Sequence, residues 1–201
     1  MPGSAFASAV EPKLSKITLV RHGVPAWDFR TPIPGRGLCQ WLDGERDAAL
    51  ERVQATRPSA ELEQLVRSAT CLMVSPLRRA IESAKIVAPD VTPVIDEHFS
   101  EAALPCAIQS RLRFPPLVWA AFARTAWFCG WSPGVESFTA ARTRAALAAG
   151  ILHARAQRQS SVVLIGHGLM NILIARELRA LGWRGPRFPR PRHWAFGVYV
   201  H

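Results

Sequence analysis

Short apolar runs rich in β-branched residues alternate along the chain with longer stretches of helical periodicity. The apolar runs predict strands at 17–20, 71–74, 91–95, 161–165 and 195–200. The stretches between them predict helices at 47–54, 59–67, 77–87, 134–155 and 169–181. Strands that alternate with helices are typical of an α/β fold, so we expect a sheet that is mainly parallel.

Two helix ends carry further signals. Ser75 is the predicted N-cap of the helix at 77–87, with Pro76 at its first helical position, and Gly182 is the predicted C-cap of the helix at 169–181. Arg78 and Arg79 then fall in a first turn, where positive charge is unfavourable for the helix dipole. Two arginines at this place indicate a negatively charged group nearby.

One segment differs from the rest in composition. Residues 105–133 are rich in Trp, Phe and Pro, and their only charged residues are arginines. We predict a partly helical, cap-like insertion at 102–135, within a single domain that covers 1–201 and begins with a loose arm at 1–15. The aromatic side chains of the insertion could line a substrate pocket, form a contact between two copies in a homodimer, or complete the core.

Composition narrows the setting in which the protein works. The 201 residues are 49% hydrophobic, yet no apolar run is long enough to span a bilayer, and no signal peptide is apparent. We therefore expect a cytoplasmic protein without a membrane partner. The four cysteines lie in different segments without a C-x-x-C pair, which predicts free thiols and neither a zinc site nor a disulfide framework.

Charge points to anionic partners. The formal net charge is +10, carried mostly by arginines that are spread along the chain. No nucleic-acid-binding motif is present, so small phosphorylated or carboxylated molecules are the preferred partners over nucleic acid.

Polar residues follow several of the predicted strands. Arg21 and His22 end the first strand, Arg79 follows the second, Glu101 follows the third and His167 follows the fourth. Ligands of parallel α/β sheets bind outside the carboxyl ends of the strands, where these side chains would meet. Imidazole is a competent nucleophile near neutral pH, and guanidinium groups can hold an oxyanion.

Three blocks carry a family resemblance: 19–23 (LVRHG), 75–80 (SPLRRA) and 166–168 (GHG). In this order and at this spacing they resemble the signature blocks of the histidine phosphatase superfamily, also called the phosphoglycerate mutase-like family. The segment 99–101 (FSE) resembles the part that carries the family's acidic residue. The resemblance implies a three-layer αβα sandwich with an inserted cap, and a metal-independent phosphatase that needs no cofactor.

The resemblance also implies roles for single residues. His22 would attack phosphorus and form a phosphohistidine, while Arg21, Arg79 and His167 hold the phosphoryl oxygens. Glu101 would protonate the leaving oxygen and later take a proton from water. Arg78 is the alternative to Arg79 as the anion contact, and Glu97 is the alternative to Glu101 as the acid. We expect the remaining histidines to be structural or on the surface, namely His98, His153, His193 and His201.

The chain departs from the family pattern after the first block. The family often has Thr or Ser and then Asn where this chain has Pro25 and Asp28. Asp28 would repel a phosphate if it faced the pocket, and it could instead pair with Arg30. These departures disfavour a glycolytic mutase. We expect a phosphomonoesterase for a small phosphorylated metabolite; the alternatives are a phosphotransferase or mutase, a phosphohistidine protein phosphatase, and a non-enzymatic protein that binds phosphorylated ligands.

Overall fold

A five-stranded sheet forms the centre of the protein in the computed structural model, which describes residues 14–51 and 57–201. The strand order is β4-β3-β6-β1-β7, and only β7 runs antiparallel to its neighbour. The strands are β1 (Lys16–Arg21), β3 (Cys71–Val74), β4 (Val94–Ile95), β6 (Ser161–Gly166) and β7 (Phe196–Val200). The mainly parallel sheet predicted from the sequence is confirmed.

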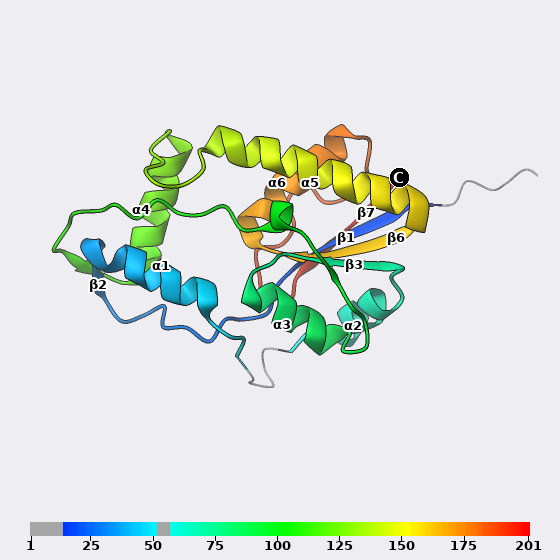
Figure 1. Ribbon diagram of the computed structural model, residues 1–201, viewed down its shortest axis with the longest axis horizontal. Coiled ribbons are helices and arrows are strands. Elements are labelled where there is room, and N and C mark those ends of the chain that lie inside the picture. Colours follow the sequence, from blue (N-terminus) through cyan, green and yellow to red (C-terminus); the bar gives the residue numbers. More distant parts are fainter. Residues whose placement is uncertain (1–13, 52–56) are drawn as a thin grey trace, which may run out of the picture.

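Helices cover both faces of this sheet (Figure 1). Strand residues alternate between the two faces, as Ile17 and Leu19 belong to one apolar core and Val20 to the other. The first core is completed by two helices, α5 (Phe138–Gln159) and α6 (Gly168–Ala180). The second core is completed by α2 (Ala60–Arg67) and α3 (Arg78–Val87). The protein is thus the predicted three-layer αβα sandwich.

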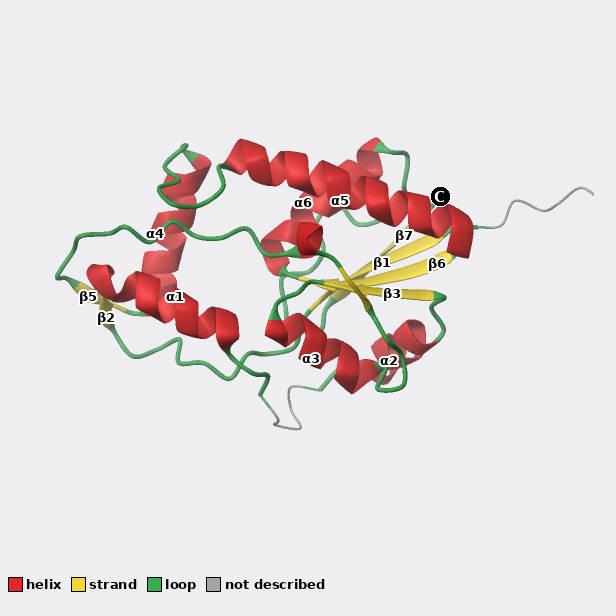
Figure 2. Ribbon diagram, in the orientation of Figure 1, coloured by secondary structure: helices red, strands yellow, loops and turns green. Residues whose placement is uncertain are grey.

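A smaller region lies beyond the end of the sheet toward which β1 runs (Figure 2). It combines a two-stranded sheet of β2 (Ile33–Pro34) and β5 (Arg113–Phe114) with the 3₁₀ helix η1 (Gly35–Gly37), α1 (Leu38–Asp47) and α4 (Pro116–Phe128). Trp119 of α4 donates its indole N–H to the carbonyl of Ile33 at 3.0 Å and packs against Leu38. Part of the aromatic segment therefore forms a small core with α1.

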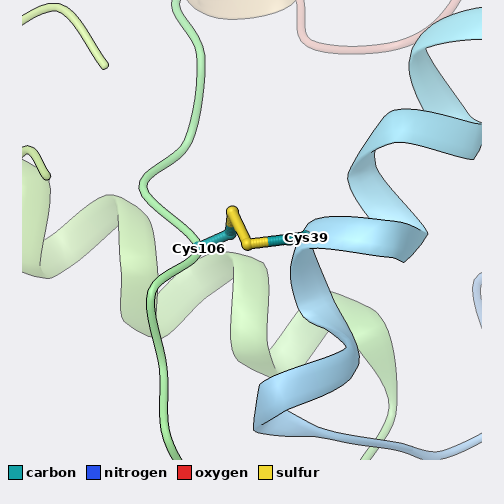
Figure 3. The surroundings of a disulfide bond; sticks show 2 residues. All are labelled: Cys39 and Cys106. Atoms are coloured by element: carbon teal, nitrogen blue, oxygen red, sulfur yellow. A yellow bond between two sulfur atoms is a disulfide. The ribbon is translucent and has the colours of Figure 1, made fainter. Parts of the chain in front are cut away.

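A disulfide joins Cys39 to Cys106 in this smaller region, so the prediction of free thiols is wrong for these two cysteines. Figure 3 shows the bond between the first turn of α1 and the extended segment after Glu101. The cysteines are 67 positions apart, and pairing of β2 with β5 contributes to bringing their segments together. Structural disulfides are rare in reducing compartments, so the bond weakens the prediction of a cytoplasmic location.

Several element boundaries differ from the expected ones. The helix predicted at 47–54 is wrong, because α1 ends at Asp47, and 52–56 lie outside the described residues, as does most of the predicted arm at 1–15. Ser75 does not cap α3: the N-cap is Leu77, without a side-chain bond. The helix predicted at 134–155 is α5, which begins at Phe138 and ends at Gln159; its N-cap Ser137 accepts the N–H of Ala140 at 3.1 Å.

A last short element precedes the site. The 3₁₀ helix η3 (Glu97–Phe99) follows β4 and leads directly to Glu101. In the ranges 14–51 and 57–201, no helix has the length and apolar character needed to cross a membrane.

Candidate active site

The register of two central strands brings the histidines together. Arg21 at the end of β1 lies opposite Gly166 at the end of β6, and the strands are parallel. The next residues, His22 and His167, therefore leave the sheet side by side, with ring centroids 5.0 Å apart. Both are buried, and the backbone N–H of His22 donates to the carbonyl of Gly166 at 3.0 Å. Two imidazoles far apart in sequence meet at one sheet edge.

Hydrogen bonds fix the tautomer of His22. Its Nδ1 lies 2.7 Å from the carbonyl oxygen of Gly23, which can only accept, so Nδ1 carries the hydrogen. Nε2 then carries the lone pair, which accepts the Nε–H of Arg79 at 3.1 Å. Burial lowers the pKa of His22 well below its ordinary value, and the charge of Arg79 lowers it further. A neutral imidazole with an available Nε2 is a competent nucleophile.

His167 is held from the neighbouring strand end. Its Nε2 lies 2.7 Å from Oγ of Ser75, which also accepts the N–H of Leu77. We assign the hydroxyl hydrogen to the bond with Nε2, which leaves Nδ1 of His167 as an N–H group. Burial, followed by the electrostatic interaction with the neighbouring His22 imidazole, lowers the pKa of His167 well below its ordinary value. Ser75 is thus a site residue that positions an imidazole, not a helix cap.

Two buried nitrogens at this edge have no hydrogen-bond partner among the described residues: Nδ1 of His167 and Nε of Arg21. Burying such groups without a partner costs free energy. One end of the Arg21 side chain is already used, since Nη1 donates to the carbonyl oxygen of Pro191. An anion that accepts from both free nitrogens would remove the cost, which makes this edge suited to a phosphoryl group.

Arg79 and not its neighbour reaches this edge. Its side chain is buried, whereas the Arg78 side chain is 59% exposed and pairs with Glu82 at 2.7 Å. Arg79 also contacts the last turn of α1, where Nη1 lies 3.4 Å from Oε1 of Glu45 and 3.3 Å from the Glu45 carbonyl oxygen. The guanidinium group therefore bridges the nucleophile candidate and the smaller region.

Glu101 lies at the start of α6. Its oxygens accept the backbone N–H groups of Leu169 at 3.3 Å, Met170 at 3.0 Å and Ala102 at 3.0 Å. Its rival Glu97 is exposed and lines an outer cavity with Arg46 and Arg78. Of the two carboxylates weighed in the sequence, Glu101 is the one near Arg21, whose pKa it raises against the larger effect of burial.

Two residues at the site were not among the sequence candidates. Glu45 comes from α1. His193, which the sequence analysis assigns to a structural or surface role, comes from the segment before β7 and lies next to His22. The ring of His193 lies 5.1 Å from that of His22, and its Nδ1 lies 3.1 Å from the His22 carbonyl oxygen. Burial and then Arg21 lower the pKa of His193 to about 4. Neither residue belongs to a local motif; only tertiary contacts bring them here.

The segment around His193 also explains Gly23. Trp194 adopts φ 61°, a strained conformation for a bulky residue, and its N–H donates to the carbonyl of Arg21 at 3.1 Å. Its indole lies so close to Gly23 that a Cβ there would be 2.5 Å from Cζ2. Gly23 therefore makes room for the indole of Trp194.

Asp28 does not oppose an anion at this site. It is exposed and accepts the backbone N–H groups of Arg30 at 2.8 Å and Thr31 at 3.0 Å. Hydrogen bonds from Thr31 and then Arg30 lower its pKa to about 2. The carboxylate closes a surface turn, so its presence in place of Asn does not argue against phosphate binding.

Comparisons with known proteins agree with this geometry. The family model of the histidine phosphatase superfamily (branch 1) matches residues 17–195. A mycobacterial glucosyl-3-phosphoglycerate phosphatase is 22% identical over 82% of this chain and 79% of its own, with a TM-score of 0.57. An Entamoeba histolytica phosphoserine phosphatase mutant, solved with phosphoserine, is 17% identical over 82% of this chain and 80% of its own, with a TM-score of 0.51. No curated protein matches the chain. At these identities the solved structures show a shared fold.

Proposed function

Because the chain belongs to the histidine phosphatase superfamily, we propose that it is a phosphomonoesterase that hydrolyses a small phosphorylated metabolite through a phosphohistidine at His22. The observation that carries the proposal is the pair of buried nitrogens without partners, on Arg21 and His167, next to the neutral imidazole of His22. A phosphoryl group is the anion that both binds such donors and reacts with such a nucleophile.

In the proposed reaction, Nε2 of His22 attacks phosphorus and the bond to the leaving oxygen breaks. Arg79 shifts its Nε–H from His22 to a phosphoryl oxygen, and Arg21 and His167 donate to the others. Such transfers are accelerated mainly by positioning and by stabilising charge on the oxygens. The leaving oxygen needs a proton from a carboxyl group, for which the sequence predicts Glu101. Water then attacks the phosphohistidine and releases phosphate.

The groups in this scheme are all side chains of the protein, so we propose that the reaction proceeds without a metal ion. The substrates named for the two solved neighbours, glucosyl-3-phosphoglycerate and phosphoserine, are both small phosphorylated molecules. They are sensible first probes for this chain, together with generic phosphate esters.

The test is hydrolysis of p-nitrophenyl phosphate with a chelator present. We expect turnover by the wild-type protein that disappears in His22→Ala. His153→Ala is a matched control, because His153 is bonded to Trp183, away from the site. No turnover of any phosphate ester by the wild-type protein, or equal turnover in His22→Ala, would contradict the proposal.

A further inference from the structure

The backbone that leads to Glu101 is held by one arginine of α5. Arg144 donates from Nη1 to the carbonyl oxygen of His98 at 3.0 Å and to that of Ser100 at 2.7 Å. The first carbonyl lies in η3, and the second directly precedes Glu101, where no helix or strand fixes the backbone. Hydrogen bonds from a charged donor are stronger than those between neutral groups. One guanidinium group thus fixes the chain immediately before Glu101.

Arg144 is itself held in one orientation by Glu136. Its Nε–H donates to Oε2 of Glu136 at 3.1 Å, and its Nη2 donates to Oε1 of the same carboxylate. Two parallel bonds of this kind fix the plane of the guanidinium group. The side chains of Arg144 and Glu136 are only 20% and 24% exposed, so water competes little for these bonds. The pair forms a rigid bracket, and Nη1 of Arg144 is left to face the two carbonyls.

The carboxyl group of Glu101 is held at a second place, the first turn of α6. It accepts the backbone N–H groups of Leu169 at 3.3 Å and Met170 at 3.0 Å, and this turn follows His167 directly. Helices α5 and α6 pack against each other in the same core. The bracket on α5 and the first turn of α6 therefore set the position of Glu101 relative to His167 from two sides.

We propose that Arg144 is a positioning residue for proton transfer, because it keeps the carboxyl group of Glu101 within reach of the leaving oxygen. The inference rests on the proposed phosphatase function with Glu101 as the acid. When His22 attacks phosphorus, the P–O bond breaks, its electron pair stays on the leaving oxygen, and this oxygen takes the Glu101 proton. Water then attacks phosphorus and gives its proton to Glu101, while the P–N bond electrons return to His22.

Proton transfer needs hydrogen-bond distance between the acid and the leaving oxygen, whereas attack by His22 does not depend on Glu101. A displacement of about 1 Å in such a group can lower the rate about 10²-fold. Loss of Arg144 should therefore slow the esters whose leaving oxygen needs the proton. Esters with a leaving group that departs without protonation should react almost as before.

The experiment measures how kcat/KM, which reports the formation of the phosphohistidine, depends on the leaving group. The substrates are substituted phenyl phosphates from p-nitrophenyl to unsubstituted phenyl, whose leaving oxygens need increasing protonation. Arg144→Met removes the bracket, and Arg144→Lys keeps a charged donor. Arg142→Met is the matched control, because Arg142 is exposed on the same helix. Glu101→Gln shows the effect of losing the acid altogether.

Thermal unfolding of each variant checks the fold. Glu136→Gln provides the second variant, because it loosens the bracket and leaves the arginine in place. It carries the test if Arg144→Met does not fold, and the same change in leaving-group dependence is expected, at a smaller size.

We expect Arg144→Met to hydrolyse p-nitrophenyl phosphate within about fivefold of wild type and to lose about 10²-fold in kcat/KM on phenyl phosphate. Its plot of log kcat/KM against leaving-group pKa becomes steeper, as in Glu101→Gln. The double variant Arg144→Met with Glu101→Gln is no steeper than Glu101→Gln alone, because both changes act on one proton transfer. Arg144→Lys restores part of the phenyl phosphate rate, and Arg142→Met behaves as wild type.

Three results would overturn the inference. Equal losses on all esters in Arg144→Met mean that Arg144 supports the fold or phosphate binding, and a wild-type slope in this variant means that Glu101 is positioned without it. A wild-type slope in Glu101→Gln means that the proton comes from another group. The proposed phosphatase activity fails separately, if the wild-type protein hydrolyses none of the esters.

Discussion

The site has two halves that are built differently. The strand-edge half, comprising Arg21, His22, His167 and Glu101, is fixed by strand register and backbone hydrogen bonds. The cap half, comprising α1 with Glu45, reaches the site through contacts with Arg79 and is linked by the Cys39–Cys106 disulfide to the segment after Glu101. The difference separates a half whose geometry follows from strand register from a half that depends on contacts between segments far apart in the sequence.

Substitutions in the strand-edge half should lower kcat the most. We expect His22→Ala to lower kcat for p-nitrophenyl phosphate by about 10⁴-fold or more, because it removes the proposed nucleophile. His167→Ala should also lower kcat strongly, since it removes the buried donor beside His22. Steady-state kinetics check both, and residual activity within tenfold of wild type in His22→Ala would contradict the assignment.

Arg79 contacts both halves, and its substitution should cause the next largest loss of kcat. We expect Arg79→Ala to lower kcat by about 10²–10³-fold, because a charged donor to the phosphoryl oxygens is lost. Arg78→Ala is the matched control, since its side chain is exposed and pairs with Glu82. Similar losses in the two variants would show that Arg79 is not the anion contact.

The disulfide tests how far the cap half depends on its covalent link. Cys39→Ser with Cys106→Ser should lower the free energy of unfolding by roughly 2–4 kcal/mol, because the link closes a long loop in the unfolded chain. Cys129→Ser, which replaces an exposed free cysteine, should leave the free energy of unfolding unchanged. Denaturant unfolding measures both, and a stability loss equal to that of Cys129→Ser would contradict the structural role of the bond.

Acid should also lower the free energy of unfolding. The pKa values of His22, His167 and His193 are all lowered in the folded protein, so the unfolded chain binds more protons below the ordinary pKa of 6.5. Stability is therefore full above that pH and falls as pH decreases, by at most about 1.4 kcal/mol per pH unit for each of the two buried histidines and by less for the partly exposed His193. For His193 the loss ends near its folded pKa of about 4.

Denaturant unfolding at a series of pH values checks this sign. His193→Asn should make the free energy of unfolding fall less steeply between about pH 6 and about pH 4, because the contribution of this histidine is removed. The same slope in wild type and variant would mean that His193 titrates as an ordinary exposed histidine.

The sequence predicted the strand-edge half because its signals are local. Apolar runs mark β1, β3 and β6, and residues that follow parallel strands must share one sheet edge. The family resemblance selected Arg79 over Arg78 and Glu101 over Glu97. The structure places Arg79 against Nε2 of His22, and Glu101 against the first turn of α6, which follows His167.

The cap half could not be predicted in this way. Glu45 and His193 reach the site only because α1 and the segment before β7 pack against it, and no spacing rule relates either residue to His22. The Cys39–Cys106 pair was missed for the same reason, since its cysteines meet across a 67-residue separation. The start of α1 at Leu38 was also not predicted, because the Pro and Gly residues just before it are typical of a loop.

The most direct test of the central claim is to trap the phosphorylated protein. The wild-type chain is mixed with p-nitrophenyl phosphate, quenched in alkali, which preserves phosphohistidine, and digested for mass spectrometry. The account predicts one added phosphoryl group on the peptide that contains His22, and none in His22→Ala. Turnover without any phosphorylated peptide, or with the phosphoryl group on another residue, would contradict it.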